Sequence, residues 1–299
     1  MLEVYYYENS ICAERVLMTL FEKDMHDWIP RHLHLFKGEQ FAAEYLRLNP
    51  KGVVPTIVHD GEVVRESAII CDYLDDISTD KPLKPPSPIK RAQMREWIKD
   101  GDDYVFESVG SLSFASVFRA RMLEMALDER AAHWAKQRVL DRALRQISCV
   151  ELGLDSPYVI RAIASWDRTW KYIEAALTDG RSWLMGEQFT LAEICYAPFI
   201  ARIDGLKILE IWLEDRPLAR AWYKRVAERP SFAVAEVGPS KDERAIYERE
   251  GGKISQGVAA RLLEIRAGRG LEMALGALRG GAANRQPGNG SRDPPAARG

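Results

Sequence analysis

The segment from Asn49 to Ser67 constrains the fold of this chain more than any other part of its sequence. It holds a Val54-Pro55 pair, then two short apolar runs, Thr56 to Val58 and Glu62 to Val64, with Asp60-Gly61 between them. An Asp-Gly pair between apolar runs favours a two-residue type I′ hairpin turn, because both central residues of that turn need a positive φ. The segment therefore predicts two antiparallel strands that follow a proline and lead into a helix.

The composition excludes several classes of protein. The 299 residues are 46% hydrophobic and 29% charged, which is typical of a globular chain long enough for two domains. A formal net charge of −2 gives no reason to expect nucleic acid or an anionic membrane as a partner. No apolar run approaches the roughly 20 residues that span a bilayer, and the start of the chain lacks the basic flank and apolar core of a secretory peptide.

The cysteines point to a compartment. Four are scattered along the chain: Cys12, Cys71, Cys149 and Cys195. This pattern fits a reducing environment better than a disulfide framework. We expect a cytoplasmic protein.

The first 78 residues alternate between strand and helix patterns. Alternation of apolar residues predicts strands at 2–7 and 28–36, and apolar residues at helical spacing predict helices at 11–23, 39–46 and 67–76. With the hairpin in its place, the element order is βαβ–αββα. That order is the one of a thioredoxin-like α/β domain, which we expect over residues 1–78.

The rest of the chain predicts an all-α domain and a tail. Residues 79–88 contain four prolines and form a linker. Helical periodicity dominates residues 89–235 in these segments: 89–110, 113–126, 128–145, 157–178, 190–204 and 217–229. Residues 236–299 are rich in Gly and Arg, so we expect a partly disordered, inert extension. A helix over 258–278 is weakened by its glycines, and disorder is expected after Gly280.

Three motifs resemble those of the cytosolic glutathione S-transferases, over roughly residues 1–235. They are Asn-Ser-Ile-Cys-Ala-Glu-Arg-Val at 9–16, Val54-Pro55 with Glu66-Ser67, and the capping box formed by Thr190 and Glu193. The resemblance implies a thioredoxin-like glutathione-binding domain followed by a helical substrate domain. It also implies a homodimer, with glutathione as cosubstrate and a hydrophobic electrophile as the second substrate.

Val54-Pro55 and Glu66-Ser67 are candidates for holding glutathione. An X-Pro bond adopts cis at a cost of about 0.5–1 kcal/mol, and a bend there exposes the backbone of Val54 for strand-like pairing with a peptide. A helix that starts at Ser67 can bind an anion with its N–H groups, and the Ser67 hydroxyl can cap it. The resemblance implies that these groups bind the γ-glutamyl carboxylate and that Glu66 binds the ammonium.

Ser10 and Cys12 are alternative catalytic residues. A hydroxyl at Ser10, where the first helix begins, can donate a hydrogen bond that favours a thiolate over a thiol, whose ordinary pKa is about 8.5. The motif resembles the serine-type transferases of the zeta and tau kind. In omega- and beta-type relatives a nearby cysteine forms mixed disulfides, and some reductive dehalogenases carry a similar Ser-Ile-Cys run. Asn9 or backbone donors are a third alternative, and Arg15 is expected to be structural.

Two further sets of candidates complete the site. Many relatives place Gln or Lys where this chain has Val53, so Lys37, Gln40 or Lys51 is expected to hold the glycyl carboxylate. An apolar substrate pocket is expected from aromatic residues of the second domain, although their helical spacing also suits a core. These candidates are Tyr104, Phe106, Phe114, Phe118, Trp166, Trp170 and Tyr172.

The expected reaction is attack by the glutathione thiolate on a hydrophobic electrophile, by conjugation or by displacement of an aryl ether or halide. The charged stretch 127–150 resembles bacterial transferases near the β-etherases, but it sets no substrate. His32 and His34 lack an obvious third ligand, so no metal is expected. The alternatives are a glutathione-dependent isomerase, a thiol reductase that uses Cys12, or a non-catalytic binding module.

Overall fold

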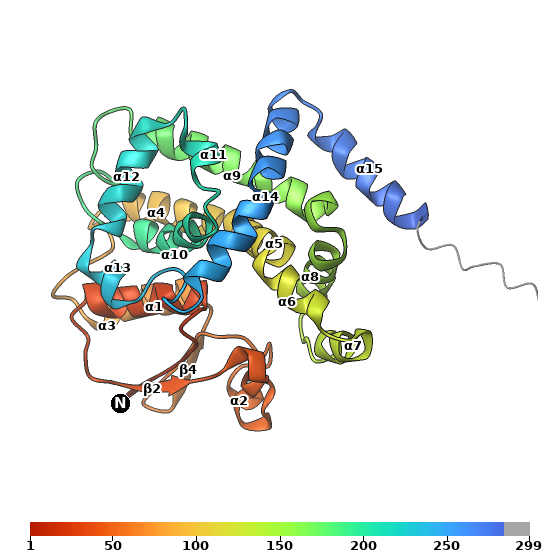
Figure 1. The fold of residues 1–299 in the computed structure, drawn as a ribbon. Helices are drawn as coiled ribbons and strands as arrows, with labels where there is room; N and C mark the ends of the chain where they lie inside the picture. Colours follow the sequence, from red (N-terminus) through yellow and green to blue (C-terminus); the bar gives the residue numbers. More distant parts are fainter. Residues whose placement is uncertain (284–299) are drawn as a thin grey trace, which may run out of the picture.

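A four-stranded mixed sheet forms the centre of the first domain in the computed structural model, which describes residues 1–283 (Figure 1). The order is β2-β1-β3-β4, in which β1 and β2 run parallel and the other neighbours run antiparallel. The strands are β1 (Leu2–Tyr6), β2 (Trp28–His32), β3 (Thr56–His59) and β4 (Glu62–Arg65). The expected thioredoxin-like α/β class is confirmed. The disorder expected near the end of the chain falls mostly on residues 284–299, outside the described part.

The hairpin has the predicted geometry. Asp60 has φ 51° and Gly61 has φ 90°, the two positive values that a type I′ turn requires. His59 pairs with Glu62 directly across the turn. A cis peptide bond joins Val54 to Pro55 immediately before β3.

The helices of this domain are α1 (Ile11–Glu22), α2 (Ala43–Leu48) and α3 (Ser67–Ile77). β2 is shorter than expected because the chain turns into a 3₁₀ helix at Leu35–Lys37, which ends at Gly38 with φ 78°. The helix expected at 39–46 is likewise split into a 3₁₀ turn, Glu39–Phe41, and α2. Both irregular turns bring this loop to the side of the sheet where β1 ends.

The second domain is helical from the end of the linker onward, as predicted. Its elements are α4 (Pro88–Asp100), a π-helical segment (Gly101–Val105), α5 (Phe106–Ala115), α6 (Val117–Glu124), α7 (Leu127–Ala135), α8 (Leu140–Leu152), α9 (Pro157–Ala176), α10 (Leu191–Gly205), α11 (Glu210–Leu213), α12 (Pro217–Ala227) and α13 (Pro230–Val234). The charged helix expected at 128–145 is two helices, because α7 ends at Ala135 and Val139 is extended.

Helix α9 is the centre of this domain and packs against α5, α8, α12 and the C-terminal helix α14 (Arg244–Arg266). Trp166 and Trp170 on α9 are both 0% exposed, and their rings stack with centroids 5.7 Å apart. These two residues were wrong as pocket candidates, because a central helix turns its large apolar side chains into the core. Their burial stabilises the domain instead.

The capping box at the start of α10 is present as predicted. The Thr190 hydroxyl accepts a hydrogen bond from the Ala192 N–H at 3.2 Å, and the Glu193 carboxylate accepts one from the Thr190 N–H at 2.9 Å. The other oxygen of Glu193 accepts from the Leu184 N–H at 2.6 Å. Both groups are fully buried, so this box fixes where α10 begins.

The C-terminal segment is far more ordered than we expected. It forms α14 (Arg244–Arg266) and α15 (Gly270–Ala283), separated at Gly268, which has φ 84°. Helix α14 crosses the helical domain and contacts α6, α9 and α10 (Figure 1). Its buried stripe belongs to the main core and consists of Tyr247, Ile254, Val258 and Leu262. Residues 244–266 of the extension are therefore an integral part of the fold.

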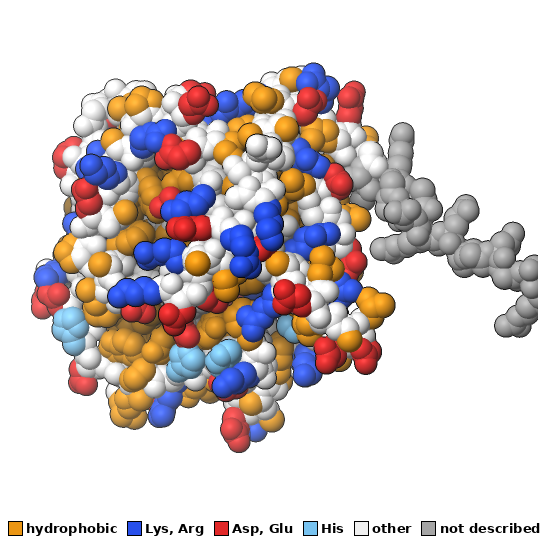
Figure 2. Space-filling view, viewed as in Figure 1, with side chains coloured by type: hydrophobic (Ala, Val, Ile, Leu, Met, Phe, Trp, Pro, Cys, Tyr) orange, Lys and Arg blue, Asp and Glu red, His pale blue; other side chains and the backbone are white. Residues whose placement is uncertain are grey.

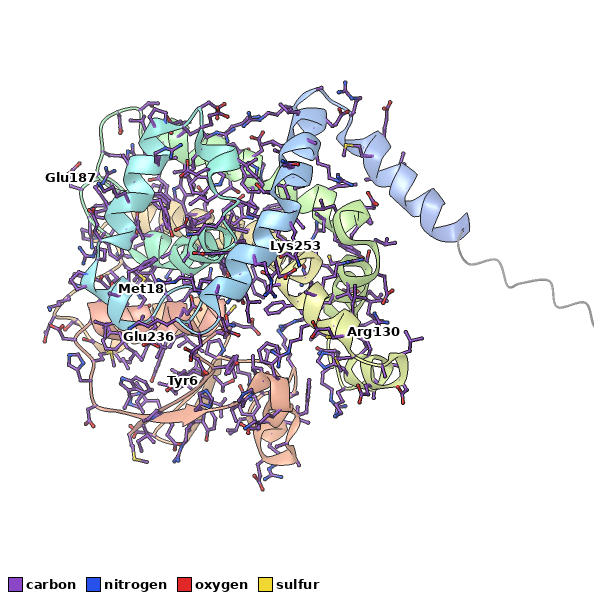
Figure 3. All side chains as sticks on the ribbon, in the orientation of Figure 1. Tyr6, Met18, Arg130, Glu187, Glu236 and Lys253 are labelled. Carbon is purple, nitrogen blue, oxygen red and sulfur yellow. The ribbon has the colours of Figure 1, made fainter. Side chains whose placement is uncertain are left out.

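The approach to α14 runs along the first domain. Figure 3 shows Met18 of α1 close to the segment that carries Glu236, just after α13, and α1 and α13 are in contact. The N–H of Gly238 donates a hydrogen bond to Glu14 of α1 at 3.0 Å. Among the described residues, no helix is long and apolar enough to cross a membrane.

Candidate active site

Ser10 lies in the turn between β1 and α1. Its N–H donates to the Tyr7 carbonyl at 3.0 Å, and its hydroxyl oxygen accepts from the Ala13 N–H at 3.4 Å as the N-cap of α1. A hydroxyl that accepts through a lone pair keeps its proton for donation to another group. The positive end of the α1 dipole adds a field that favours an anion at this point. Ser10 is half-buried, at the mouth of the helix, as the sequence predicted.

The bend before β3 leaves one residue with a free backbone. The Val53 carbonyl accepts from the Tyr45 hydroxyl at 2.6 Å and from the Asn49 amide at 2.9 Å. Among residues 1–283, by contrast, neither the N–H nor the C=O of Val54 has a hydrogen-bond partner. Because a backbone group this close to the interior is normally paired, Val54 offers both a donor and an acceptor to an extended peptide.

The start of α3 is strained and uncapped. Glu66, the N-cap residue, has φ 68°, a left-handed conformation that non-glycine residues rarely adopt outside functional sites. Its side chain makes no capping bond within the described chain; instead its carboxylate pairs with the Lys51 ammonium at 2.7 Å. The first N–H groups of α3 are therefore available to an anion.

Ser67 does not cap α3, contrary to our expectation. It is the first residue of the helix, and its hydroxyl accepts a hydrogen bond from the Arg15 guanidinium at 2.9 Å. A side chain already inside the helix cannot reach back over its own end in the manner of an N-cap. Ser67 is buried next to Arg15 and beside the uncapped N–H groups.

The candidates for the glycyl carboxylate differ in availability. Gln40 is buried and donates to the Leu35 carbonyl at 3.2 Å, and Lys51 is paired with Glu66. Lys37 is exposed on its 3₁₀ helix and makes no ion pair with any described residue. Of the three side chains, Lys37 is the one without a protein partner.

Cys12 lies one residue into α1, beside Ser67 and Arg15. Although part of its side chain reaches the surface, burial raises the pKa of the Cys12 thiol, and the Arg15 guanidinium and a hydrogen bond with Ser67 offset this rise only in part. A thiol with a raised pKa is protonated at neutral pH and is a poor nucleophile. The electrostatics of the folded chain therefore do not activate Cys12.

Arg15 makes hydrogen bonds to both domains next to the candidate site. It is 2% exposed and donates to Ser67 on α3, to the Asp102 carboxylate at 2.8 Å and to the Cys195 carbonyl at 3.0 Å. Its guanidinium also lies 4.4 Å from the ring centre of Phe199. The expected structural role is thus an interdomain one, which the sequence did not indicate.

Aromatic side chains from both domains form a series of ring contacts that starts at Tyr7, three residues before Ser10. Tyr7 and Phe36 of the first domain have ring centres 6.0 Å apart, and Phe36 lies 6.2 Å from Phe118 of α6. Phe118 in turn contacts Phe114 at 4.9 Å and Tyr247 of α14 at 6.4 Å. We call these five residues the aromatic wall. It begins three residues before Ser10 and spans four elements. Phe36, Phe114 and Phe118 reach the surface, whereas Tyr7 and Tyr247 are buried behind them.

The sequence predicted only part of the aromatic wall. Phe114 and Phe118 were expected, whereas Tyr7, Phe36 and Tyr247 were not. Tyr7 could have been found, because it directly follows β1 and lies just before the Asn9–Val16 motif. Tyr247 carried no local signal, since it lies in the segment expected to be an extension.

Tyr104, another expected pocket residue, lies apart from the aromatic wall. It is 45% exposed in the π-helical segment, and the Arg168 guanidinium is 3.9 Å from its ring centre. Figure 2 shows histidine side chains in its lower part. His32 and His34 have ring centres 6.4 Å apart. Within the described residues, no group of three or more metal-binding side chains is found.

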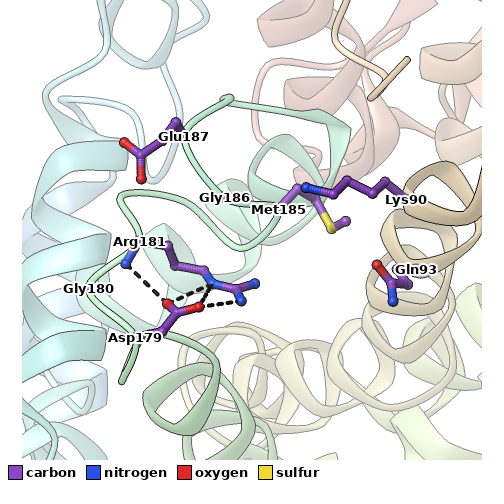
Figure 4. A pocket seen from close by; sticks show the side chains of 8 residues that line it. All are labelled: Lys90, Gln93, Asp179, Gly180, Arg181, Met185, Gly186 and Glu187. Carbon is purple, nitrogen blue, oxygen red and sulfur yellow. Dashed lines mark hydrogen bonds and ion pairs between the residues drawn. The ribbon is translucent and has the colours of Figure 1, made fainter. Parts of the chain in front are cut away.

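Two surface hollows lie away from Ser10, Val54 and Glu66. One, of about 410 Å³, lies between α4 and the loop 179–187, where Asp179 holds Arg181 (Figure 4). The second lies beside it along α4 and includes Tyr172, an expected pocket residue. Neither is lined by Ser10, Val54 or Glu66, so backbone geometry and not hollow size locates the candidate site.

Two family models match this chain. The model of the glutathione S-transferase N-terminal domain matches residues 9–77, and the model of the glutathione S-transferase C-terminal domain matches residues 120–225. The two matches together cover more than half of the chain and fall on the two domains seen in the structure. The chain belongs to the glutathione S-transferase family.

The chain is also similar to individual proteins of known activity or structure. The chain is 29% identical to the tetrachloro-p-hydroquinone reductive dehalogenase of Sphingobium chlorophenolicum, over 79% of this chain and 96% of that protein. The crystal structure of the β-etherase LigF from Sphingobium sp. strain SYK-6 superposes with a TM-score of 0.69 at 27% identity, covering 79% of this chain and 98% of that one. Glutathione S-transferase Z1 of Arabidopsis thaliana is 38% identical over 92 residues, which are 30% of this chain and 41% of that protein.

Proposed function

We propose that this chain is a glutathione transferase, which activates the glutathione thiol for attack on a hydrophobic electrophile. The observation that carries the proposal is the unpaired backbone of Val54 beside the uncapped start of α3, with Ser10 at the start of α1. The relation to a β-etherase and a reductive dehalogenase supports displacement of an aryl ether or halide, besides simple conjugation.

In this proposal glutathione is held along its whole length. The N–H and C=O of Val54 pair with its cysteinyl backbone, in the manner of an added strand. The N–H groups at the start of α3 bind the γ-glutamyl carboxylate, and Glu66 exchanges Lys51 for the γ-glutamyl ammonium. Lys37, or Lys51 once it is released, meets the glycyl carboxylate.

Ser10 supplies the chemistry of activation. Its hydroxyl donates a hydrogen bond to the sulfur, and the N-terminus of α1 adds its field, so the ionised sulfur is favoured over the thiol. Glutathione supplies the nucleophile and its thiol proton passes to solvent, so no protein base is required. A carbon–sulfur bond forms as the carbon–halogen or carbon–oxygen bond of the electrophile breaks, and the leaving group departs as an anion. The aromatic wall holds the electrophile beside Ser10.

A second candidate function uses Cys12. The reductive dehalogenase among the relatives makes this worth testing. The Cys12 thiolate could attack a glutathione disulfide, so that a mixed disulfide with Cys12 forms as the old sulfur–sulfur bond breaks and a glutathione thiolate leaves. The raised pKa of the Cys12 thiol argues against it.

We also propose a homodimer in the reducing cytoplasm. The four cysteines are all unpaired, which fits a reducing compartment. Ile69 on α3 is 58% exposed and Ile89 on α4 is 67% exposed, and such apolar side chains suit a surface covered by a second copy. Light scattering on the purified protein tests the dimer; a monomer at micromolar concentration contradicts it.

The test of the enzymatic proposal compares Ser10→Ala with Cys12→Ala. We expect Ser10→Ala to lower kcat/KM about 10- to 100-fold with glutathione binding retained, since loss of a hydrogen bond to an ionised group costs roughly 1.5–3 kcal/mol. Cys12→Ala should stay within about threefold of the wild type. Calorimetric titration with glutathione and its S-hexyl conjugate accompanies the kinetics.

Two other outcomes would each support one of the alternative functions. If Ser10→Ala is fully active and Cys12→Ala is inactive, the chain is a thiol reductase. If the wild type binds neither glutathione nor the conjugate, the chain is a binding module with the transferase fold.

A further inference from the structure

Asn9, the residue before Ser10, has its side chain buried in a polar cluster that the proposed reaction does not use. The cluster joins three parts of the chain far apart in sequence: the turn after β1, Arg202 on α10, and the start of α14. We propose that Asn9 is a positioning residue for Ser10 and that α14 holds it in place through Tyr247 and Glu243. This inference rests on the proposed function, because it concerns the activation of the same thiol.

The turn gives Asn9 direct control over Ser10. The hydrogen bond from the Ser10 N–H to the Tyr7 carbonyl closes a β-turn in which Glu8 and Asn9 are the central residues. Any rotation of the Asn9 backbone therefore moves Ser10 relative to β1 and α1. Asn9 is 8% exposed, so its side chain is inside the protein and not in solvent.

The Asn9 amide has partners on every side. Its side-chain oxygen accepts from the Arg202 guanidinium at 2.5 Å and faces the Tyr247 hydroxyl at 3.3 Å. Its side-chain nitrogen donates to the Glu243 carboxylate at 2.5 Å. Its backbone carbonyl also accepts from Arg202, at 3.0 Å. A carboxylate or an apolar side chain could not satisfy this set, because the site needs a side-chain donor and a side-chain acceptor, and the Asn9 amide presents both.

Tyr247 and Glu243 are held firmly enough to act as a support. Tyr247 is 1% exposed, its ring packs against Phe118, and the Arg202 guanidinium lies 5.1 Å from its centre. Glu243 immediately precedes α14 and is half-buried. Both residues lie beyond residue 225, where the second family model ends, so this support comes from a part of the chain that the model does not include.

The test measures the ionisation of bound glutathione, which a purely structural role would not change. Thiolate absorbance of the protein–glutathione complex, recorded against pH, gives the apparent pKa of the bound thiol. Tyr247→Phe removes one hydroxyl and keeps the ring. We expect it to raise this pKa by about half a unit, with kcat/KM about threefold lower below that pKa and the glutathione Kd within about twofold.

Three further variants and one control make the result specific. Asn9→Ala should raise the pKa by about one unit, that is about tenfold in thiolate below the pKa. Glu243→Ala should raise it about as much as Tyr247→Phe does, and Glu243→Gln, which keeps an oxygen acceptor for Asn9, should recover at least half of that rise. Tyr223→Phe is the matched control, since Tyr223 is a buried tyrosine that hydrogen-bonds Asp204 at 3.5 Å, away from the site. It should leave the pKa unchanged.

The inference is overturned if Tyr247→Phe and Glu243→Ala bind glutathione with the wild-type thiol pKa, whatever they do to thermal stability. It is also overturned if Tyr223→Phe shifts the pKa equally. If Tyr247→Phe fails to fold, the Glu243 pair decides the question alone. Absence of any thiolate signal in the wild type refutes the proposed function itself, and this outcome is distinct because it needs no variant.

Discussion

The two halves of the candidate site are built in different ways. The half that would hold glutathione comes from two short stretches, residues 9–15 and 51–67, and relies largely on backbone groups at Val54 and at the start of α3. The half that would hold the electrophile is a set of side chains from four elements, which are more than 200 residues apart at the extremes. A ligand shared by a whole family can be held by local backbone geometry. A substrate particular to one chain depends on long-range packing.

Helix α1 lies between these halves, and Arg15 is its connection to both domains. We expect Arg15→Met to lower the free energy of unfolding by about 3 kcal/mol, because Ser67, Asp102 and a buried carbonyl all lose their donor. Affinity for glutathione and for S-hexylglutathione should fall together. Urea unfolding and titration check both effects.

Arg31→Met is the control, since Arg31 is half-exposed and pairs with Glu3 on the surface. It should change stability by less than about 0.5 kcal/mol. A loss below about 1 kcal/mol in Arg15→Met would show that the two halves are stabilised independently.

The raised pKa of Glu14, also on α1, predicts how the stability of the folded chain depends on pH. Burial raises the pKa of Glu14 to about 8, while Arg202 and the Gly238 N–H partly oppose this. The unfolded carboxyl ionises near its ordinary value of 4.5, so between that pH and 8 the folded chain binds the extra proton. Stability should therefore fall as the pH rises through this window.

Glu14→Gln removes the titrating group and should flatten that slope. Between pH 5 and pH 8 we expect the variant to gain on the order of 2 kcal/mol relative to the wild type. Urea midpoints at the two pH values measure the difference. Parallel pH profiles for the two proteins would refute the raised pKa.

Glu66→Gln tests the glutathione half of the candidate site separately from the electrophile half. Loss of the charge that would meet the γ-glutamyl ammonium should weaken binding of glutathione and of its S-hexyl conjugate by the same factor, about tenfold. Stability should hardly change, because the ion pair with Lys51 is exposed. Lys51→Met breaks the same pair without removing the carboxylate, and an equal loss of affinity in that variant would argue against a direct role for Glu66.

Phe118→Ala separates the electrophile half, with the smallest expected effect. The preference for S-hexylglutathione over glutathione should shrink about fivefold, since less apolar surface is covered, and glutathione affinity should stay the same. Tyr104→Ala serves as the comparison, because Tyr104 lies against Arg168 and not on the aromatic wall. A reduced preference in Tyr104→Ala alone would move the electrophile site to that surface.

Local patterns were sufficient for much of the fold and for the place of Ser10 and Val54 within it. The hairpin at Asp60-Gly61, the capping box at Thr190 and the position of Ser10 follow from the residue types within a few positions. The predictions that were wrong concern residues whose surroundings are set by contacts with residues distant in the sequence. Ser67 accepts a bond from Arg15 instead of capping its helix, and Trp166 faces the core because α9 is surrounded by other helices.

The electrophile half could be predicted only in part for the same reason. Phe118 was a candidate, but nothing near Tyr247 in the sequence indicates that its hydroxyl reaches a turn 238 residues away. The sequence predicted only a weak helix over 258–278, whereas burial of one apolar stripe keeps α14 helical over Arg244–Arg266. Tertiary packing outweighs local propensity in such a segment.

The contact between Asn9 and Tyr247 bears on how this enzyme is made. A ribosome releases the chain from its N-terminus, and the thioredoxin-like domain, whose contacts are local, can form early. The turn that carries Ser10, however, gains its last partners only when α14 has emerged, after most of the chain is synthesised. A nascent chain would thus have its glutathione-binding backbone well before it could activate the thiol.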